Sequence, residues 1–169
     1  MVDWIPATPE QAQDRITRLG GQPSWTGTPR WPHWNDDAIP FLGQFAVGQR
    51  LVLVFCSPEP DAEAWKAEGG GNAALVEPDG PTPSWVSTRD QAEGPVMLPN
   101  LTLLPAEPLE LGGTPDWLQN DDTPQAASHF ILELDSFPDP DGWITFGDGG
   151  TAYLFTSQDG DVARFLWQT

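Results

Sequence analysis

The chain has 169 residues with 25 Asp and Glu against seven Lys and Arg, which gives a net charge of -18 at pH 7. Such a charge repels nucleic-acid phosphates and anionic membrane surfaces, and this argues against both as partners. The length suits one domain with a real core, and nine Trp and eight Phe supply large buried areas that oppose disorder. The 19 Pro and 17 Gly favour short strands and turns over long helices.

Two short helices are predicted in the first half of the chain. Residues 8–19 have apolar positions at helical spacing, with Thr8 as the N-cap and Gly20 as the C-terminal stop. Residues 61–68 form a second candidate, which the glycines at 69–71 end. All other signals along the chain favour strands, loops and turns.

Strands are predicted in both halves of the chain. Gly48-Gln49 is a tight turn with glycine at its first position, and Asp159-Gly160 is a strong hairpin signal. Residues 22–40, rich in Pro, Trp and Asp, predict an ordered loop, and residues 147–150 predict a turn. The expected strands span residues 41–47, 50–56, 73–76, 96–104, 129–134, 143–146, 151–155 and 162–167.

One sequence pattern occurs twice. Leu-Gly-Gly-Gln-Pro-Ser-Trp at residues 19–25 returns as Leu-Gly-Gly-Thr-Pro-Asp-Trp at residues 111–117. Each copy continues through Asn-Asp-Asp and a proline into an apolar strand, and a second strand closes the unit, so the units cover about 19–56 and 111–156. Two related units of this kind pack on each other, because one alone leaves an apolar face in water.

The predicted fold is therefore α+β and mainly β. It consists of two tandem related β units packed as one pseudo-symmetric domain over residues 1–169, with one or two short helices. In such a domain Trp25 and Trp117 take corresponding and largely buried positions, and the two Gly-Gly pairs form corresponding turns.

Few residues carry the patterns that catalysis or metal binding requires. Asp36-Asp37 and Asp121-Asp122 suggest paired catalytic carboxylates or a metal site, but neither pair has the alternating ligands and final glutamate of a calcium loop. His33 and His129 lack the cysteine pair of a zinc site, and no Gly-x-Ser-x-Gly nucleophile elbow is present. We predict turn-forming aspartates and structural histidines, with no metal, no cofactor and no enzymatic activity.

Three further features bear on the role and the location of the protein. Cys56, the single cysteine, lies in an apolar run and is expected to be a buried, inert thiol. Asp3 and Pro6 lie where a secretory leader would carry basic and then apolar residues, so we expect a cytoplasmic protein. Tryptophans beside carboxylates are also typical of sugar-binding surfaces. Those left open to such a role are Trp31, Trp34, Trp85 and Trp143.

The second copy carries three motifs in a fixed order. They are Leu-Gly-Gly-x-Pro-x-Trp-x-Gln at residues 111–119, Phe-Ile-Leu-Glu-Leu-Asp at 130–135 and Phe-Gly-Asp-x-Gly-x-x-Tyr-Leu-Phe at 146–155. Together they resemble the YwqG-like family, domain of unknown function 1963. The chain departs from the family pattern at Glu133, where the family has Gln, and at Phe146, where it has Trp. The resemblance implies a mainly β, α+β fold without established enzymatic activity and, because some members are encoded beside bacterial polymorphic toxins, a role as an immunity protein.

Three functional classes follow: a toxin-neutralising immunity protein, a small-ligand or carbohydrate-binding module, and a hydrolase that uses acidic residues. The first joins the resemblance to the charge, because an acidic protein steers onto a basic partner, although acidity also serves solubility alone. We predict a bacterial, non-enzymatic protein that binds a basic protein partner such as a cognate toxin. A twofold relation of the repeats would bring the aspartate pairs together. The predicted contact surface comprises Asp36, Asp37, Asp121, Asp122 and Trp34.

Overall fold

The structure is a computed structural model that describes residues 2–136 and 144–169. In this part of the chain the helical elements are two single 3₁₀ turns, η1 (Gln11–Gln13) and η2 (Pro60–Ala62). No helix among the described residues is long and apolar enough to cross a bilayer. The strands are β1 (Trp4–Pro6), β2 (Arg18–Gly20), β3 (Trp31–Trp34), β4 (Asp37–Ala38), β5 (Phe41–Val47), β6 (Arg50–Cys56), β7 (Asn72–Glu77), β8 (Ser87–Arg89), β9 (Thr102–Pro105), β10 (His129–Asp135), β11 (Thr151–Thr156) and β12 (Ala163–Gln168).

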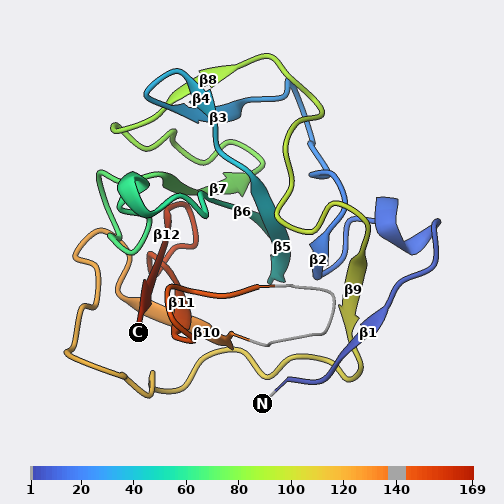
Figure 1. The fold of residues 1–169 in the computed structure, drawn as a ribbon. Helices are drawn as coiled ribbons and strands as arrows, with labels where there is room; N and C mark the ends of the chain where they lie inside the picture. Colours follow the sequence, from blue (N-terminus) through green and yellow to red (C-terminus); the bar gives the residue numbers. More distant parts are fainter. Residues whose placement is uncertain (1, 137–143) are drawn as a thin grey trace.

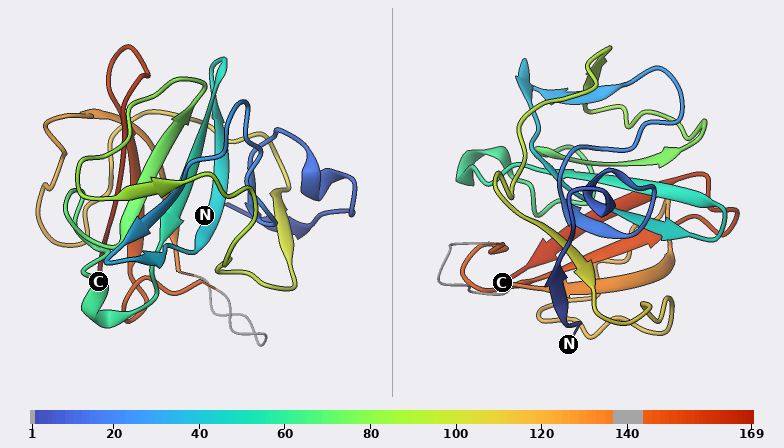
Figure 2. Two further views of the ribbon diagram at one scale, coloured as in Figure 1. Left: turned by 90° about the horizontal axis from the view of Figure 1, so that it is seen from above. Right: turned by 90° about the vertical axis from the view of Figure 1, so that its right-hand side faces the viewer.

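The described strands form three sheets arranged as layers (Figures 1 and 2). The central sheet has six strands in the order β1-β9-β2-β5-β6-β7. The small sheet β4-β3-β8 lies on one side of its β5-β6-β7 part, and the meander β10-β11-β12 lies on the other. The fold is therefore mainly β with several antiparallel sheets, which confirms the predicted predominance of strands.

Strand β6 is apolar on both faces, and this explains the layers. Its alternate side chains enter two different clusters of the core. Leu51, Leu53 and Phe55 pack in the cluster under the small sheet. Burial raises the pKa of the Cys56 thiol to about 12, which agrees with the predicted inert role. The side chains of β6 that face the meander are Val52, Val54 and Cys56.

The meander β10-β11-β12 is also covered on both faces. Its inner face adds Leu132, Leu134 and Leu154 to the cluster that it shares with β6. On its outer face, Tyr153 packs with Trp117, which belongs to the loop before β10. Both faces of this sheet therefore hold apolar side chains away from water.

The strands β5 and β10 share details of geometry. The register of β5 with β6 shifts between Phe41 and Gly43, and the register of β10 with β11 shifts between Phe130 and Leu132. Both glycines of each repeated pair, at residues 20–21 and 112–113, have positive φ angles. Glycine adopts this conformation without steric cost, which explains why the pattern carries glycine at these positions.

The repeated tryptophans also have matching contacts. Trp25 stacks on Phe55 with ring centroids 6.1 Å apart, and Trp117 stacks on Phe155 at 5.8 Å. Both tryptophans have intermediate burial, so most of each side chain is buried, as predicted, while a part stays in contact with water. Each ring stacks on a phenylalanine of a strand and stays partly exposed, and the Trp25 indole N–H donates to the Ala92 carbonyl oxygen at 3.0 Å.

The helix predicted over residues 8–19 is wrong. Its first turn forms as expected, since the Thr8 N–H donates to Gln11 Oε1 at 2.9 Å and the Gln11 N–H donates to Thr8 Oγ1 at 3.2 Å. The helix ends after η1 because Arg18–Gly20 pair with β5 and β9 as strand β2. The second predicted helix, over 61–68, is likewise reduced to η2. Long-range strand pairing overrides the local helix signal in the first segment, and in the second the left-handed conformation of Glu63, with a φ angle of 51°, ends the turn.

Most predicted strands are confirmed. Those at residues 41–47 and 50–56 match β5 and β6 throughout, and four others lie within one residue of β7, β10, β11 and β12. The strand predicted over 96–104 is wrong for most of its length, since only its end lies in β9. The one predicted over 143–146 starts at Trp143, outside the described residues.

Arg18 of β2 is fully buried and forms no ion pair with the described residues. Its guanidinium donates to the backbone oxygens of Asp14, Gly20 and Gln22 and to Ser24 Oγ. Burial lowers the pKa of Arg18 to about 10. One side chain thus ties β2 to the loop on both sides of it.

Replacing Arg18 by Met should lower the free energy of unfolding by about 3 kcal/mol, because it leaves buried carbonyl oxygens without donors. Urea denaturation measures this change. The matched control is Arg15→Met, which removes the same charge from an exposed position and should change the stability by less than about 0.5 kcal/mol. Equal effects of the two substitutions would show that charge, and not the hydrogen-bond network, is responsible.

Candidate functional site

The first aspartate pair lies in the hairpin between β3 and β4. Asn35 and Asp36 have φ angles of 48° and 67°, the conformation that a two-residue turn between antiparallel strands requires. Asp36 is exposed and pairs with Arg89 of β8 at 3.8 Å. Asp37 is also exposed, whereas Trp34 is half-buried against the cluster under the small sheet. This pair therefore has the geometry of turn-forming residues.

The second aspartate pair lies in the loop before β10. Asp121 Oδ1 accepts hydrogen bonds from the Thr123 N–H at 3.0 Å and the Thr123 hydroxyl at 2.6 Å. These bonds, the side-chain bond foremost, lower the pKa of Asp121. Asp122 Oδ2 accepts from Gln168 Nε2 at 2.8 Å. Both carboxylates thus serve the local structure of the loop.

The two aspartate pairs lie in separate parts of the molecule. The β3–β4 hairpin belongs to the small sheet on one side of the central sheet, and the loop before β10 lies beside the meander on the other side (Figures 1 and 2). Trp34 accompanies only the first pair. The five residues that the sequence groups into one contact surface therefore occupy two surfaces.

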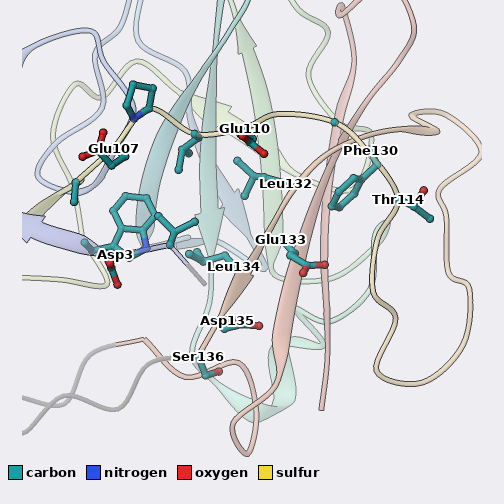
Figure 3. A pocket seen from close by; sticks show the side chains of 16 residues that line it. Asp3, Glu107, Glu110, Thr114, Phe130, Leu132, Glu133, Leu134, Asp135 and Ser136 are labelled. Carbon is teal, nitrogen blue, oxygen red and sulfur yellow. The ribbon is translucent and has the colours of Figure 1, made fainter.

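A cleft of about 820 Å³ lies between the edges of two sheets. One wall consists of residues 2–4, which lead into β1, and residues 106–110, which follow β9, and the other consists of β10 (Figure 3). Strand β1 is the outer strand of the central sheet, and β10 is the outer strand of the meander. The cleft exists because the two sheets diverge beyond the part of the core that they share.

Among the described residues, five carboxylates line this cleft, and no basic side chain does. Asp3 and Glu107 lie on one side in Figure 3, opposite Glu133. The seven Lys and Arg of the chain all lie in the described residues, and none forms an ion pair with a cleft carboxylate. The cleft carboxylates are Asp3, Glu107, Glu110, Glu133 and Asp135.

The cleft has an apolar floor between its acidic sides. Leu132 and Leu134 are buried and lie between the two groups of carboxylates in Figure 3. Trp4 and Leu109 are half-buried and pack against the same core cluster. An apolar floor with an acidic rim fits a ligand segment that carries both apolar and basic side chains.

Glu133 connects the cleft wall to the preceding loop. Its Oε2 accepts a hydrogen bond from the Asp116 N–H at 3.1 Å. In the first half of the chain, Gln44 Oε1 accepts from the Ser24 N–H at the same distance, 3.1 Å. The Gln44 amide also donates to the backbone oxygens of Asp14 and Ile16, in the segment before β2. An ionised glutamate accepts hydrogen bonds as glutamine does, but it cannot donate one. Glu133 therefore carries a negative charge, whereas the Gln44 amide donates hydrogen bonds to the backbone.

The arrangement suits the binding of a cationic group better than acid catalysis. Catalysis by paired carboxylates requires one that burial in an apolar pocket keeps protonated. None of the five is buried, since Glu133 is half-buried and the others are exposed. Among the described residues, no three ligating side chains are grouped so that they could hold a metal ion.

Sequence reasoning identified only one of the cleft carboxylates, Glu133, and only as a departure from a family pattern. The others lie on three separate segments of the chain, and β1 has no strand signal of its own. A partial signal is the alternation of apolar and acidic residues over 132–135. The pairing of β1 with β9 determines that these segments face each other, and the sequence contains no mark of it.

Comparison with known proteins assigns no relative. A scan against family models, a search of curated proteins and a search of solved structures each found no match. The resemblance of residues 111–156 to the YwqG-like family therefore stays a prediction.

Tyr153 lies behind the wall that Glu133 forms and is the single tyrosine of the chain. Its hydroxyl accepts from the Leu118 N–H at 3.2 Å and donates to the Asp116 carbonyl at 2.9 Å. Desolvation by burial raises the pKa of Tyr153, and the nearby charges of Glu133, Asp116 and Asp135 add to the increase.

We expect the phenolate absorbance of the native protein to titrate above about pH 10, the value of free tyrosine. A raised pKa in the folded state stabilises the protein below the unfolded pKa, and this stability is lost as the pH rises through the folded pKa. Tyr153→Phe should therefore weaken the loss of stability at alkaline pH and leave the part that Cys56 causes. A native midpoint at or below that of free tyrosine would contradict the burial of this hydroxyl.

Proposed function

We propose that this chain is a non-enzymatic protein-binding protein whose cleft takes a basic segment of a partner protein. The observation that carries the proposal is the set of five carboxylates around an apolar floor. Like charges gathered in a cleft with apolar walls focus the electrostatic field and attract a cationic partner. Trp4 and Leu109, the half-buried residues of the floor, then offer apolar area that the partner buries on binding.

The positions of the basic side chains support this proposal. Arg30 pairs with Glu77 at 3.2 Å, and Arg164 pairs with Glu68 at 3.0 Å. Three further ion pairs involve Arg50, Lys66 and Arg89, and all five lie away from the cleft. The basic side chains of the chain therefore do not neutralise the cleft carboxylates, which stay available to a cationic partner.

We further propose that the chain contains two related β units with pseudo-symmetry, one including β5-β6-β7 and the other β10-β11-β12. Support comes from the matching register shifts, the matching tryptophan stacks and the matching hydrogen bonds of Gln44 and Glu133. In this relation β10 is the counterpart of β5, and a single domain spans residues 1–169.

The resemblance to the YwqG-like family extends the proposal to a biological role. We propose a bacterial immunity protein that acts in the cytoplasm and neutralises a basic toxin by direct binding. An acidic surface is suited to this role, because charge complementarity speeds the encounter and places the inhibitor over the basic surface of its target.

The small-ligand alternative has less support from the described residues. A carbohydrate site needs an exposed aromatic face on which a sugar ring can stack. Within residues 2–136 and 144–169, Trp65 is the one tryptophan among the exposed large hydrophobic side chains, at 41%. Its ring meets Trp167 edge-on at 6.0 Å, so Trp65 is held against another part of the protein and stands apart from the cleft.

Two variants with equal loss of charge test the proposed site. The cleft variant carries Glu107→Gln, Glu110→Gln, Glu133→Gln and Asp135→Asn. The loop variant carries Asp36→Asn, Asp37→Asn, Asp121→Asn and Asp122→Asn. The probe is a fluorescent peptide of alternating lysine and valine, and its affinity is measured by anisotropy at low and at physiological salt.

The cleft variant should bind the peptide at least about tenfold more weakly than the wild type, since each exposed charge pair contributes about 0.2 to 1 kcal/mol. The loop variant should stay within about threefold of the wild type, and salt should weaken wild-type binding through screening. A loop variant that loses binding while the cleft variant keeps it would assign the partner to the aspartate pairs instead. Equal effects of the two variants would show that only net charge matters.

The immunity role is tested by co-expression with a basic bacterial toxin domain chosen as the candidate partner. Wild type and loop variant should restore growth, and the cleft variant should fail. If all three proteins restore growth, the cleft carboxylates are not needed for neutralising the toxin.

A further inference from the structure

The outer edge of β10 is open along the cleft. In the meander β10 is the outermost strand. Among the described residues outside the meander, Gly112 forms a backbone hydrogen bond with β10: its N–H donates to the Ile131 carbonyl oxygen at 2.8 Å. The following residues of β10, from Leu132 to Asp135, line the cleft. An edge of this kind presents N–H and C=O groups that can pair with another strand.

In the first half of the chain, the corresponding edge is filled by the chain itself. Strand β2 pairs antiparallel with the outer edge of β5, with Arg18 opposite Gln44 and Leu19 opposite Gly43. The approach is close, because a Cβ atom at Gly43 would lie 2.6 Å from the Arg18 carbonyl oxygen. Strand β2 thus covers the edge of β5 directly after the register shift.

The second half lacks a strand in this position. The sequence repeat aligns Leu111 with Leu19, but Leu19 is fully buried in β2 whereas Leu111 is 41% exposed and lies in no strand. Residues 106–110 instead form the far wall of the cleft. The cleft therefore takes the place that β2 occupies beside β5.

We propose that an extended basic segment of another protein adds to β10 as an antiparallel strand, in the place corresponding to that of β2. This inference rests on the proposed function and specifies how the partner's segment binds. The four residues from Leu132 to Asp135 extend over roughly 13 Å at about 3.3 Å per residue, so a segment of similar length can pair with them. The cleft volume of about 820 Å³ lies within the range of known ligand sites of about 300 to 1,000 Å³.

The alternation of β10 defines the sequence that its partner strand needs. Leu132 and Leu134 point to the core side of the strand, where they form part of the apolar floor. Glu133 pairs across the meander with Tyr153 and, like Asp135, points to the opposite face of the strand. An added strand of alternating apolar and basic residues therefore places its apolar side chains beside the leucines and its cations beside the carboxylates.

The net charge of the chain favours a basic segment over a second copy of this chain as the added strand. A second copy of this chain also carries a net charge of -18, and it would bring further carboxylates to a cleft that already holds five. A basic segment reduces this repulsion and gains attraction at every second residue. Leu132 stands where β5 has Gly43, so the incoming residue opposite Leu132 has less room than Leu19 has beside β5.

N-methylated peptides test strand addition without altering the protein. In an edge strand, alternate residues direct their N–H groups toward the neighbouring strand. We compare the lysine–valine peptide with one form methylated on every valine amide and another methylated on every lysine amide. Strand addition predicts that one form binds at least about tenfold more weakly, because it loses several backbone hydrogen bonds to β10, and that the other stays within about threefold.

Hydrogen exchange gives a second readout in the same complex. Peptide binding should slow the exchange of those amides from Leu132 to Asp135 that point away from β11. If both methylated forms bind as well as the parent peptide while the cleft variant still weakens binding, recognition by charge stands and strand addition is wrong. If the parent peptide does not bind the wild type, the proposed function itself fails. A dimer in sedimentation that the peptide dissociates would assign the edge to a second copy and overturn the proposal.

Discussion

Strand β6 has apolar side chains on both faces, so it is stable only where other layers cover both of them. The small sheet covers one face and the meander covers the other. The meander has three strands, whereas the central sheet has six and continues through β2 and β9 to β1. The outer strands of the two sheets, β1 and β10, therefore diverge, and the cleft between them follows from the same packing that builds the core.

Electrostatics determines what this cleft can hold. Where the fold needs a charge close to the core, it supplies a partner for it, as Arg30 does for the nearly buried Glu77. Arg18 is satisfied by backbone oxygens, which removes one more cation from the surface. Most acidic residues remain in water, where mutual repulsion is modest. Five of them meet across an apolar floor, and there an external cation gains most.

The sequence allowed prediction where short-range pattern and long-range packing agree. Strands β5 and β6 follow from dense apolar runs around a glycine turn, and each of the repeated tryptophans stacks on a phenylalanine. The helix predicted from Thr8 ends after one turn because β2 gains more from pairing with β5 than from helical bonds. The cleft escaped prediction for a related reason. Its walls come from residues 2–4, β10 and residues 106–110, and only tertiary pairing brings these distant segments together.

The most direct measurement is a map of amide chemical shifts in nuclear magnetic resonance spectra as the lysine–valine peptide is added, with a glutamate–valine peptide as the control. The account predicts saturable shifts that gather on β1, residues 106–110 and β10, and none with the acidic peptide. Shifts centred on the β3–β4 hairpin and the loop that holds Asp121 would contradict it. So would small shifts spread evenly over all acidic surfaces, because they would mean that the charge attracts cations without a defined site.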